Sequence, residues 1–366
     1  MIESLPPIDH ARRIESVQQE LSSNTEGYDA WLVTDLYDIR WLTGFVGSNG
    51  WAIVRPDGVT LGTDGRYAEK ARAETAAAGV EIVAAQNGPK LHAAMVRTLR
   101  GARGVGLDDR TTPVAVWRQL AADVPLLAWP SSIMVRRQVK DAAEIARIEA
   151  AAAIADAALV DVEPNLCGMT ELEVRAELEY LMVHLGADDR SYHTIVASGP
   201  EHGARPHHGA SRREIVEGDT VIIDVGALVD GYHSDMTRSW VIGEPTARQR
   251  DIYELVGVAQ QAGLDAVRPG VDAALVDAAC RTVFEDAGYL DWYVHGTGHG
   301  VGLEIHEPPF HSPTSVDSIL TDYVVTVEPG LYRGGFGGFR IEDLVLVTDD
   351  EPGHRMLTHS PKRELN

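Results

Sequence analysis

The sequence predicts an α+β protein with two domains, of which the smaller, N-terminal one has an α/β pattern. Its 366 residues exceed the usual size of a single hydrophobic core. The first third of the chain alternates short apolar runs with helical stretches, whereas the remainder combines long amphipathic helices with a β-hairpin and further antiparallel strands. A hydrophobic content of 44% is enough to fill two cores.

The N-terminal domain is expected over residues 1–131. Between Tyr28 and Pro130 the chain carries the strand-like runs AWLVTDL, WAIV, GVTLGT, VEIVAA, GVGL and LLAW, and residues 67–78 form an alanine-rich helical stretch. Such alternation is typical of an α/β domain. The second domain is expected over residues 132–366, with its boundary near Pro130 to Val135 and its first long helix opened by the charged VKD segment.

Capping residues mark helix boundaries in the second domain. Thr170 and Glu173 predict a capping box at the start of one helix, and Gly186 predicts its end in the left-handed conformation. Thr246 and Gln249 predict a second start of the same kind. The long opening helix has an apolar face made by Ile145, Ile148, Ala152, Ala155 and Leu159.

Composition disfavours several classes of partner. Lys and Arg number 32 against 55 Asp and Glu, so the formal charge of −23 repels nucleic acid phosphates and anionic membranes. Cys167 and Cys280 lie outside any CxxC pattern, which argues against a disulfide framework or a thiolate metal site. No stretch resembles a signal peptide or approaches the roughly 20 apolar residues of a membrane span. We therefore expect a cytoplasmic protein.

Two aspartates flank a predicted hairpin in VIIDVGALVDGYHSDMTRSW. With Val229 and Asp230 in the loop, Asp224 lies opposite Asp235; with Asp230 and Gly231 in the loop, the two are offset by one same-face pair. In both cases the carboxylates share a sheet face, together with Thr237 and Ser239. Like charges that face each other across strands are destabilising unless a cation lies between them, so this arrangement favours a metal site.

Two glutamates and a histidine follow downstream. Glu328 ends the apolar run YVVTVEPGLY, and Glu342 lies within FRIEDLVLV, where a buried acid is costly without a partner. The glycine-rich RGGFGG between them lets the chain double back, which predicts adjacent antiparallel strands. The segment HGTGHGVGLEIHE, which begins at His295, supplies a nitrogen ligand at His299. Four carboxylates and one imidazole suit a pair of divalent ions such as Mn²⁺, Co²⁺ or Zn²⁺.

Other catalytic motifs are not matched. The glycines of the histidine segment do not form a dinucleotide fingerprint, because Val301 occupies the position of the third glycine. The segment is not a zincin helix either, since His311 comes one place too late for HExxH. The chain has no GxSxG elbow and no Walker-type loop.

Taken together, the motifs resemble those of the pita-bread metallopeptidases, in the branch of Xaa-Pro aminopeptidases and Xaa-Pro dipeptidases with an additional N-terminal domain. The resemblance covers nearly the whole chain, because WLTGFVGSNGWAIV and TDGRY are similar to that N-terminal domain. It implies the creatinase/aminopeptidase fold and a homodimer. It also implies two divalent ions per chain, manganese first, with cobalt or zinc as alternatives. The five metal ligands that it implies are Asp224, Asp235, His299, Glu328 and Glu342.

The resemblance also implies catalytic roles. Glu328 is expected to shuttle a proton to the leaving nitrogen after attack by a metal-bridging hydroxide. His207, preferred over His208, and His306 are expected to donate hydrogen bonds to the scissile carbonyl or the oxyanion. His295 matches a further histidine near the substrate.

The resemblance implies a peptide substrate with proline at the second position. A dipeptidase must anchor the proline carboxylate with a cation, yet residues 300–327 contain no Arg or Lys. We therefore expect an aminopeptidase that accepts longer peptides, with a dipeptidase as the alternative if Arg340, Arg333 or a partner subunit supplies the cation. A methionine aminopeptidase and a non-enzymatic peptide-binding module are less favoured, the former because of the large N-terminal domain and the latter because the ligand set is intact.

Overall fold

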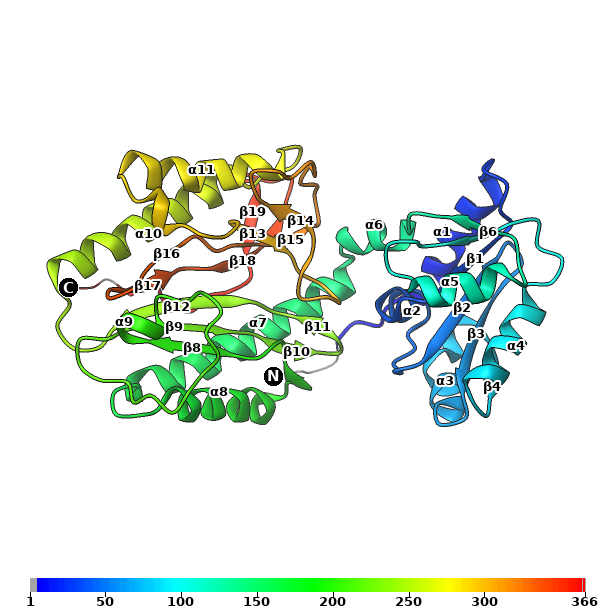
Figure 1. The fold of residues 1–366 in the computed structure, drawn as a ribbon, viewed down its shortest axis with the longest axis horizontal. Coiled ribbons are helices and arrows are strands. Elements are labelled where there is room, and N and C mark those ends of the chain that lie inside the picture. Colours follow the sequence, from blue (N-terminus) through cyan, green and yellow to red (C-terminus); the bar gives the residue numbers. More distant parts are fainter. Residues whose placement is uncertain (1–4, 364, 366) are drawn as a thin grey trace. The chain divides into compact units, whose positions relative to one another are not determined.

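The computed structural model describes residues 5–363 and residue 365, and the chain divides into two compact units (Figure 1). One unit runs from Pro7 to Arg137, and the other comprises Leu5, Pro6 and the chain from Gln138 onward. The α+β class and the smaller α/β unit agree with the prediction. None of the helices in the described part of the chain combines the length and hydrophobicity that a membrane span needs.

The first unit contains a six-stranded mixed sheet in the order β4-β3-β2-β1-β5-β6. Parallel pairing joins β1 to β5, β5 to β6 and β3 to β4, whereas β2 pairs antiparallel with both of its neighbours. The core includes Leu32, Ile53, Met95 and Leu107, all buried. In chain order the elements are α1 (His10–Ser23), β1 (Ala30–Val33), α2 (Leu36–Thr43), β2 (Gly50–Arg55), β3 (Gly58–Asp64), α3 (Ala68–Glu74), β4 (Glu81–Ala85), α4 (Gly88–Thr98), β5 (Val105–Leu107), α5 (Val114–Ala121), β6 (Leu126–Ala128) and α6 (Ser132–Gln138).

The second unit contains several antiparallel sheets between two helix pairs. The sheets have the orders β11-β10-β7, β12-β9-β8, β14-β13-β15-β18-β19 and β16-β17. Its elements are α7 (Ala142–Val162), α8 (Glu171–Leu185), β7 (Asp189–Arg190), β8 (Ile195–Ser198), α9 (Gly199–His202), β9 (Thr220–Val225), β10 (Ala227–Val229), β11 (Tyr232–His233), β12 (Met236–Val241), α10 (Ala247–Ala266), α11 (Ala273–Asp286), β13 (Gly298–Gly300), β14 (Glu307–His311), β15 (Val324–Val327), β16 (Gly330–Arg333), β17 (Gly337–Arg340), β18 (Asp343–Val347) and β19 (His354–Met356).

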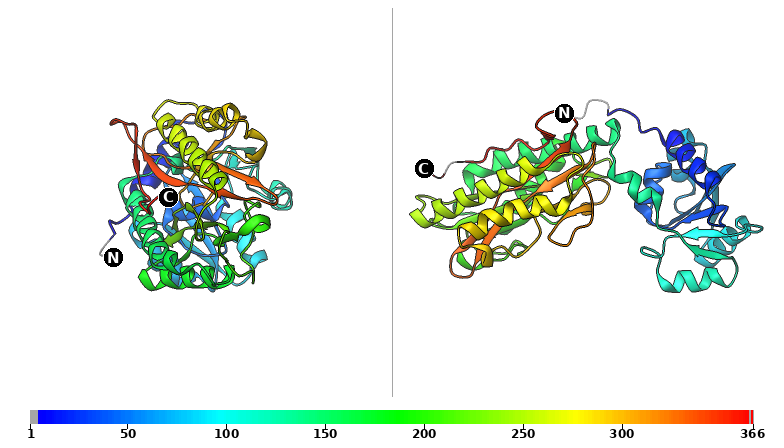
Figure 2. Two further views of the ribbon diagram at one scale, coloured as in Figure 1. Left: turned by 90° about the vertical axis from the view of Figure 1, so that its left-hand side faces the viewer. Right: turned by 90° about the horizontal axis from the view of Figure 1, so that it is seen from above.

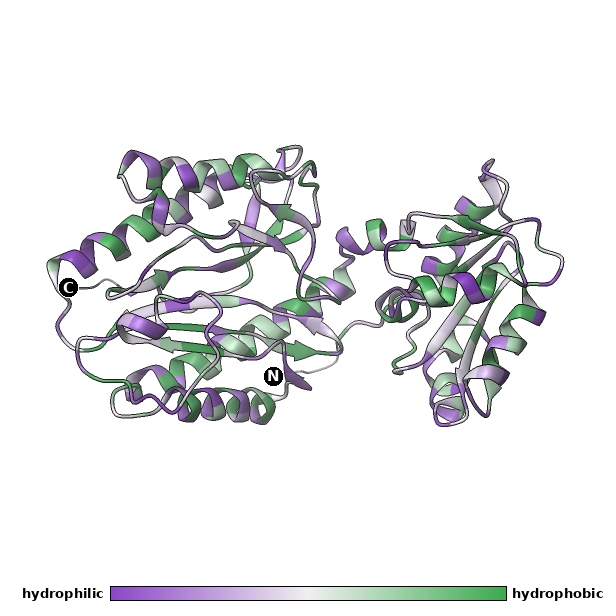
Figure 3. Cartoon of the chain, viewed as in Figure 1, coloured by the Kyte–Doolittle hydropathy of each residue, from purple (hydrophilic) through white to green (hydrophobic). Residues whose placement is uncertain are grey.

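The two helix pairs cover opposite sides of these sheets. Helices α7 and α8 share a buried core with β8, β9 and β12, whereas α10 and α11 share another with β15, β17 and β18. Figure 1 shows the strands between the pairs, and Figure 2 shows α10 and α11 side by side in yellow-green to yellow. Hydrophobic residues gather on the central strands, and hydrophilic residues cover much of the outer helices (Figure 3). Burial of apolar area on both sides therefore holds the strands in the middle of the unit.

The predicted helix boundaries of this unit are confirmed. Thr170 and Glu173 form a capping box at the start of α8, and Gly186 ends that helix with φ 116°. Thr246 and Gln249 form a second capping box at the start of α10. Each box satisfies backbone N–H groups that the first helical turn leaves without an intrahelical partner.

The hairpin that carries the two aspartates uses the Asp230–Gly231 loop. Val229 pairs with Tyr232, and the register continues unchanged to Asp224 opposite Thr237. Asp230 and Gly231 both have positive φ, 44° and 76°, as a two-residue hairpin turn requires. The offset alternative of the sequence prediction is therefore the one that the structure adopts.

Candidate metal centre

The five predicted metal ligands line one cavity of about 470 Å³ in the second unit. Asp224 lies on β9, and His299 lies on β13. Glu328 directly follows β15 and Glu342 directly precedes β18; the two strands pair antiparallel, as the glycine-rich connection predicts. Asp235 lies in the same cavity, just before β12. Three separate strand pairings thus bring together side chains that are far apart in the sequence.

Distances between the polar atoms are short enough to share metal ions. The Nε2 atom of His299 lies 3.5 Å from Asp235 Oδ2 and 3.5 Å from Glu328 Oε1. Ligand atoms of Asp235, His299 and Glu342 all lie within 4.8 Å of one another. His299 Nδ1 donates to the carbonyl of Gly300 at 3.0 Å, so the Nε2 lone pair faces the carboxylates.

The charges in the cavity fit a cationic occupant. Burial and neighbouring carboxylates raise the pKa values of Asp235 and Glu342 well above their usual range, and burial raises the pKa of Glu328 to about 7. Among the described residues that line the cavity, Arg340 is the only Arg or Lys. One guanidinium cannot balance four carboxylates, whereas divalent cations would. Burial also lowers the pKa of His299 to about 3, which keeps the imidazole neutral, as a metal ligand must be.

Arg340 is buried, and its guanidinium is largely occupied by protein groups. It donates to Asp224 Oδ2 at 2.5 Å, to Thr237 Oγ1 at 3.0 Å and to the Tyr332 hydroxyl at 3.0 Å. It also reaches the carbonyl of Pro206 at 3.2 Å. These contacts link β17 to β9, to β12 and to the loop that carries His207. Arg340 therefore neutralises one of the carboxylates and holds it in place.

Thr237 connects several of these groups, on the sheet face that the sequence assigns to it. Its hydroxyl accepts from Arg340 and donates to Glu342 Oε2 at 2.7 Å. Its backbone lies opposite Asp224 in the hairpin, and its carbonyl accepts from the Glu342 amide at 3.1 Å. Thr237 thus hydrogen-bonds the Glu342 carboxylate directly and is linked to the Asp224 carboxylate through Arg340.

Tyr192 is a site residue that sequence reasoning missed. Its hydroxyl donates to Asp235 Oδ1 at 2.5 Å and also contacts Asp224, so it bridges the two hairpin carboxylates. Tyr192 lies just before β8, whose pairing with β9 places Ile195 opposite Asp224. The pairing of β8 with β9 brings Tyr192 to the hairpin, and local sequence patterns do not reveal this pairing.

The predicted histidines occupy different positions around the cavity. His207, His295 and His306 all line it. The His306 ring lies 4.4 Å from the His299 ring, and burial lowers the pKa of His306. His295 Nε2 lies 2.9 Å from the Tyr332 hydroxyl, and the same hydroxyl accepts a hydrogen bond from Arg340. His208, in contrast, turns toward Glu171.

The sequence is similar to known metallopeptidases over almost its full length. It matches the model of metallopeptidase family M24 over residues 146–349 and that of the creatinase/prolidase N-terminal domain over residues 13–136. The uncharacterised peptidase YqhT of Bacillus subtilis is 37% identical over 345 residues, which span 92% of this chain and 95% of that protein. The Xaa-Pro dipeptidase of Pyrococcus furiosus is 44% identical over 230 residues, which span 63% of this chain and 65% of that protein.

Solved structures show the same architecture. An Xaa-Pro dipeptidase from Bacillus anthracis has a TM-score of 0.88 at 32% identity, and the match covers 97% of this chain and 98% of that one. An X-Pro aminopeptidase from Thermotoga maritima has a TM-score of 0.83 at 31% identity, with coverage of 92% and 97%. These matches confirm the predicted pita-bread fold with a creatinase-type N-terminal domain. Because the family model covers more than half of the chain, this protein belongs to metallopeptidase family M24.

Proposed function

We propose that this metallopeptidase is a dinuclear Xaa-Pro aminopeptidase, which hydrolyses the bond between an N-terminal residue and a following proline. We choose the aminopeptidase over the dipeptidase because of the contacts that Arg340 makes. It is the only Arg or Lys among the described cavity-lining residues, and it already binds Asp224, Thr237 and Tyr332. A dipeptidase needs a free cation beside the proline carboxylate, whereas a longer peptide carries an amide there.

The proposed ligands are Asp224, Asp235, His299, Glu328 and Glu342. When bound, two divalent ions, manganese first and cobalt or zinc as alternatives, would supply Lewis acidity and a water of lowered pKa. Their fit rests on the donor set, which is buried, rich in oxygen and deficient in positive charge.

The remaining polar groups of the cavity have proposed roles in proton transfer and substrate binding. Glu328 would carry a proton to the leaving nitrogen, because its carboxylate lines the cavity beside the other proposed ligands. His207 and His306 line the cavity where they would hydrogen-bond the peptide carbonyl as charge develops on its oxygen. His295 and Arg340, which meet at Tyr332, would border the bound substrate.

The amide nitrogen of an Xaa-Pro bond carries no hydrogen, so peptidases that bind the N–H group of the scissile bond cannot use this substrate. The mechanism proposed here does not need that N–H group, so it can act on an Xaa-Pro bond. We further propose, from the resemblance alone, that the protein acts as a homodimer; light scattering of the active protein tests this, and a fully active monomer would contradict it.

An Xaa-Pro dipeptidase is the second candidate, favoured by the Bacillus anthracis and Pyrococcus relatives, which bear that name. The two are separated by measuring hydrolysis of Ala-Pro beside Ala-Pro-Ala with Mn²⁺, Co²⁺ and Zn²⁺ in turn. We expect the tripeptide to have the higher kcat/KM. Preference for the dipeptide would support the second candidate, and no hydrolysis of either with any metal would refute both.

A further inference from the structure

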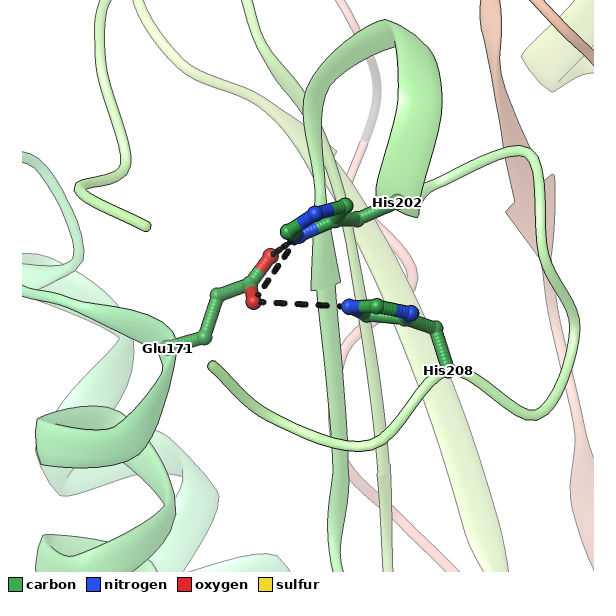
Figure 4. Close-up of side chains that lie close together, drawn as sticks. All are labelled: Glu171, His202 and His208. Atoms are coloured by element: carbon green, nitrogen blue, oxygen red, sulfur yellow. Dashed lines mark hydrogen bonds and ion pairs between the residues drawn. The ribbon is translucent and has the colours of Figure 1, made fainter. Parts of the chain in front are cut away.

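A second group of potential metal ligands lies outside the cavity of the candidate metal centre. Glu171 is the first residue of α8, His202 ends α9, and His208 follows in the loop that leads back to β9. Their ligand atoms lie within 4.8 Å of one another. Figure 4 shows both imidazoles turned toward the Glu171 carboxylate; their ring centroids lie 3.9 Å apart, and the ring planes are tilted by 32°.

The Glu171 carboxylate is fully buried and firmly held. Its Oε1 accepts from the amide and hydroxyl of Ser198, at 2.9 and 2.7 Å, and its Oε2 accepts from the amide and hydroxyl of Ser211, at 3.0 and 2.7 Å. Metal-bound carboxylates are typically hydrogen-bonded by outer groups in this way. The carboxylate is thus oriented in advance, and the direction that remains faces the two histidines.

His208 is difficult to explain as a simple hydrogen-bonding residue. Its Nε2 is buried without a hydrogen-bond partner, although it points at Glu171 Oε2. The separation of 4.0 Å is too long for a hydrogen bond. Two ligands of a tetrahedral zinc ion, each at about 2.0–2.2 Å from it, lie about 3.4 Å apart. The nitrogen would therefore have to move about half an ångström toward Oε2 for one ion to bind both atoms.

His202 can place either a proton or a metal ion next to the Glu171 carboxylate. Its Nδ1 lies 3.0 Å from Oε1 and 3.1 Å from Oε2 of Glu171, so without metal the Nδ1 proton lies between these oxygens. Transfer of that proton to Nε2 would free the Nδ1 lone pair, and the side chain is 22% exposed, so Nε2–H would have access to water. A neutral His208 with its proton on Nδ1 would present the Nε2 lone pair to the same ion.

We propose that Glu171, His202 and His208 form an auxiliary site for a divalent transition metal ion, with zinc as the preferred occupant. Two imidazole nitrogens and one carboxylate are a common zinc ligand set, and water would complete the coordination. Burial and the neighbouring His202 lower the pKa of His208, in keeping with a neutral ligand. Because all three residues brace the loop that also carries His207, a bound ion would hold that loop to α8.

The test uses the full chain with Asp235→Asn and His299→Ala combined, a double variant in which the candidate metal centre is disabled; it serves as the background for the further variants. We expect this background to bind one equivalent of Zn²⁺ in competition with a chromophoric chelator, and to show Co²⁺ d–d absorption typical of nitrogen and oxygen ligands. Adding His208→Phe, which keeps an aromatic ring beside His202, is expected to weaken binding at least tenfold. His202→Asn, which keeps a donor toward Glu171, is expected to do the same.

His184→Phe, on the exposed side of the same helix α8, is the matched control and is expected to leave Zn²⁺ affinity unchanged. Zn²⁺ affinity unaffected by both His208→Phe and His202→Asn would overturn the proposal. Absence of Zn²⁺ binding by the double variant alone would also overturn the proposal, and this outcome needs no further variant. Because the background lacks two ligands of the first centre, these results do not depend on the proposed peptidase activity.

Discussion

At the scale of single residues, charge is the dominant feature of the candidate metal centre. Four carboxylates share a buried cavity with one guanidinium, and the pKa values of Asp235 and Glu342 rise well above their usual range because burial and mutual repulsion oppose ionisation. Such an arrangement costs stability unless cations bind. It follows that the proposed ligand residues would lower the stability of the metal-free protein.

Loss of one ligand is therefore expected to remove activity but not the fold. Asp235→Asn or His299→Ala should abolish hydrolysis of Ala-Pro-containing peptides, because either change removes a proposed metal ligand. The thermal unfolding midpoint of the metal-free protein should stay the same or rise in Asp235→Asn, since a repelling carboxylate is lost. Peptide hydrolysis and circular dichroism melts measure the two effects, and unchanged turnover in either variant would refute the ligand assignment.

Tyr192 offers a finer test of the same site. Removal of its hydroxyl in Tyr192→Phe deprives Asp224 and Asp235 of a shared donor, so we expect a loss of about 10–100-fold in metal affinity or activity. Tyr180→Phe, on an exposed tyrosine of α8, is the control. Titration of Mn²⁺ against activity measures the effect. Equal metal dependence in the two variants would show that the bridge has no role.

Arg340 is expected to matter for stability as well as for activity. Arg340→Met would leave Asp224 buried without its cation and cost about 3–5 kcal/mol in the free energy of unfolding of the metal-free protein. Arg333→Met removes an exposed ion pair with Asp291 and should change stability little. Urea unfolding compares the two variants. Similar midpoints would mean that the buried pair contributes nothing net.

At the scale of elements, local signals predicted helix ends and the hairpin turn because the causes are local. Capping at Thr170 and Thr246 depends on residues three positions away, and the turn signal lies in Asp230 and Gly231. The pairing of Val229 with Tyr232 then decides between the two loops that the sequence left open. The need for glycine at position 226, in contrast, arises from a contact between the two arms of the hairpin. A Cβ atom there would lie 1.9 Å from the Ser234 carbonyl oxygen, so the close approach between the hairpin arms requires glycine.

Gly226→Ala is accordingly expected to disturb the hairpin. The added methyl must push Ser234 away and shift Asp235 relative to Asp224, which should destabilise the protein by about 1–3 kcal/mol and weaken metal binding. Gly58→Ala, whose Cβ would meet open space, is the matched control. Thermal unfolding and metal content per chain report on the two effects. A variant as stable and as metal-rich as the control would contradict this account.

At the scale of the whole molecule, the two units have separate cores. All six strands of the first sheet and the buried cluster around Leu32, Ile53 and Met95 belong to residues 7–137. The sequence could predict this unit as α/β because apolar runs alternate with helical stretches. Mixed pairing within its sheet was not predictable, since strand order depends on packing between segments that are distant in sequence.

Residues 7–137 alone are therefore expected to fold. Their core needs no side chain from the rest of the chain, so the fragment should show a cooperative thermal transition and dispersed amide resonances in solution. Absence of a cooperative transition, or a collapsed amide spectrum, would show that this unit depends on the second one.

The sequence by itself determined the residue types of the candidate centre, the helix caps, the presence of a two-residue hairpin turn at Asp230 and the resemblance that identifies the family; the strand pairing decided which two residues form that turn. These follow from spacing and local chemistry, which the linear order of residues contains. Only the tertiary structure decided that Tyr192 bridges the hairpin carboxylates, that Arg340 is occupied by Asp224, and that His208 turns to Glu171. Such contacts join β8, β9, β17 and α8, and they depend on which elements pack together, which local patterns do not encode.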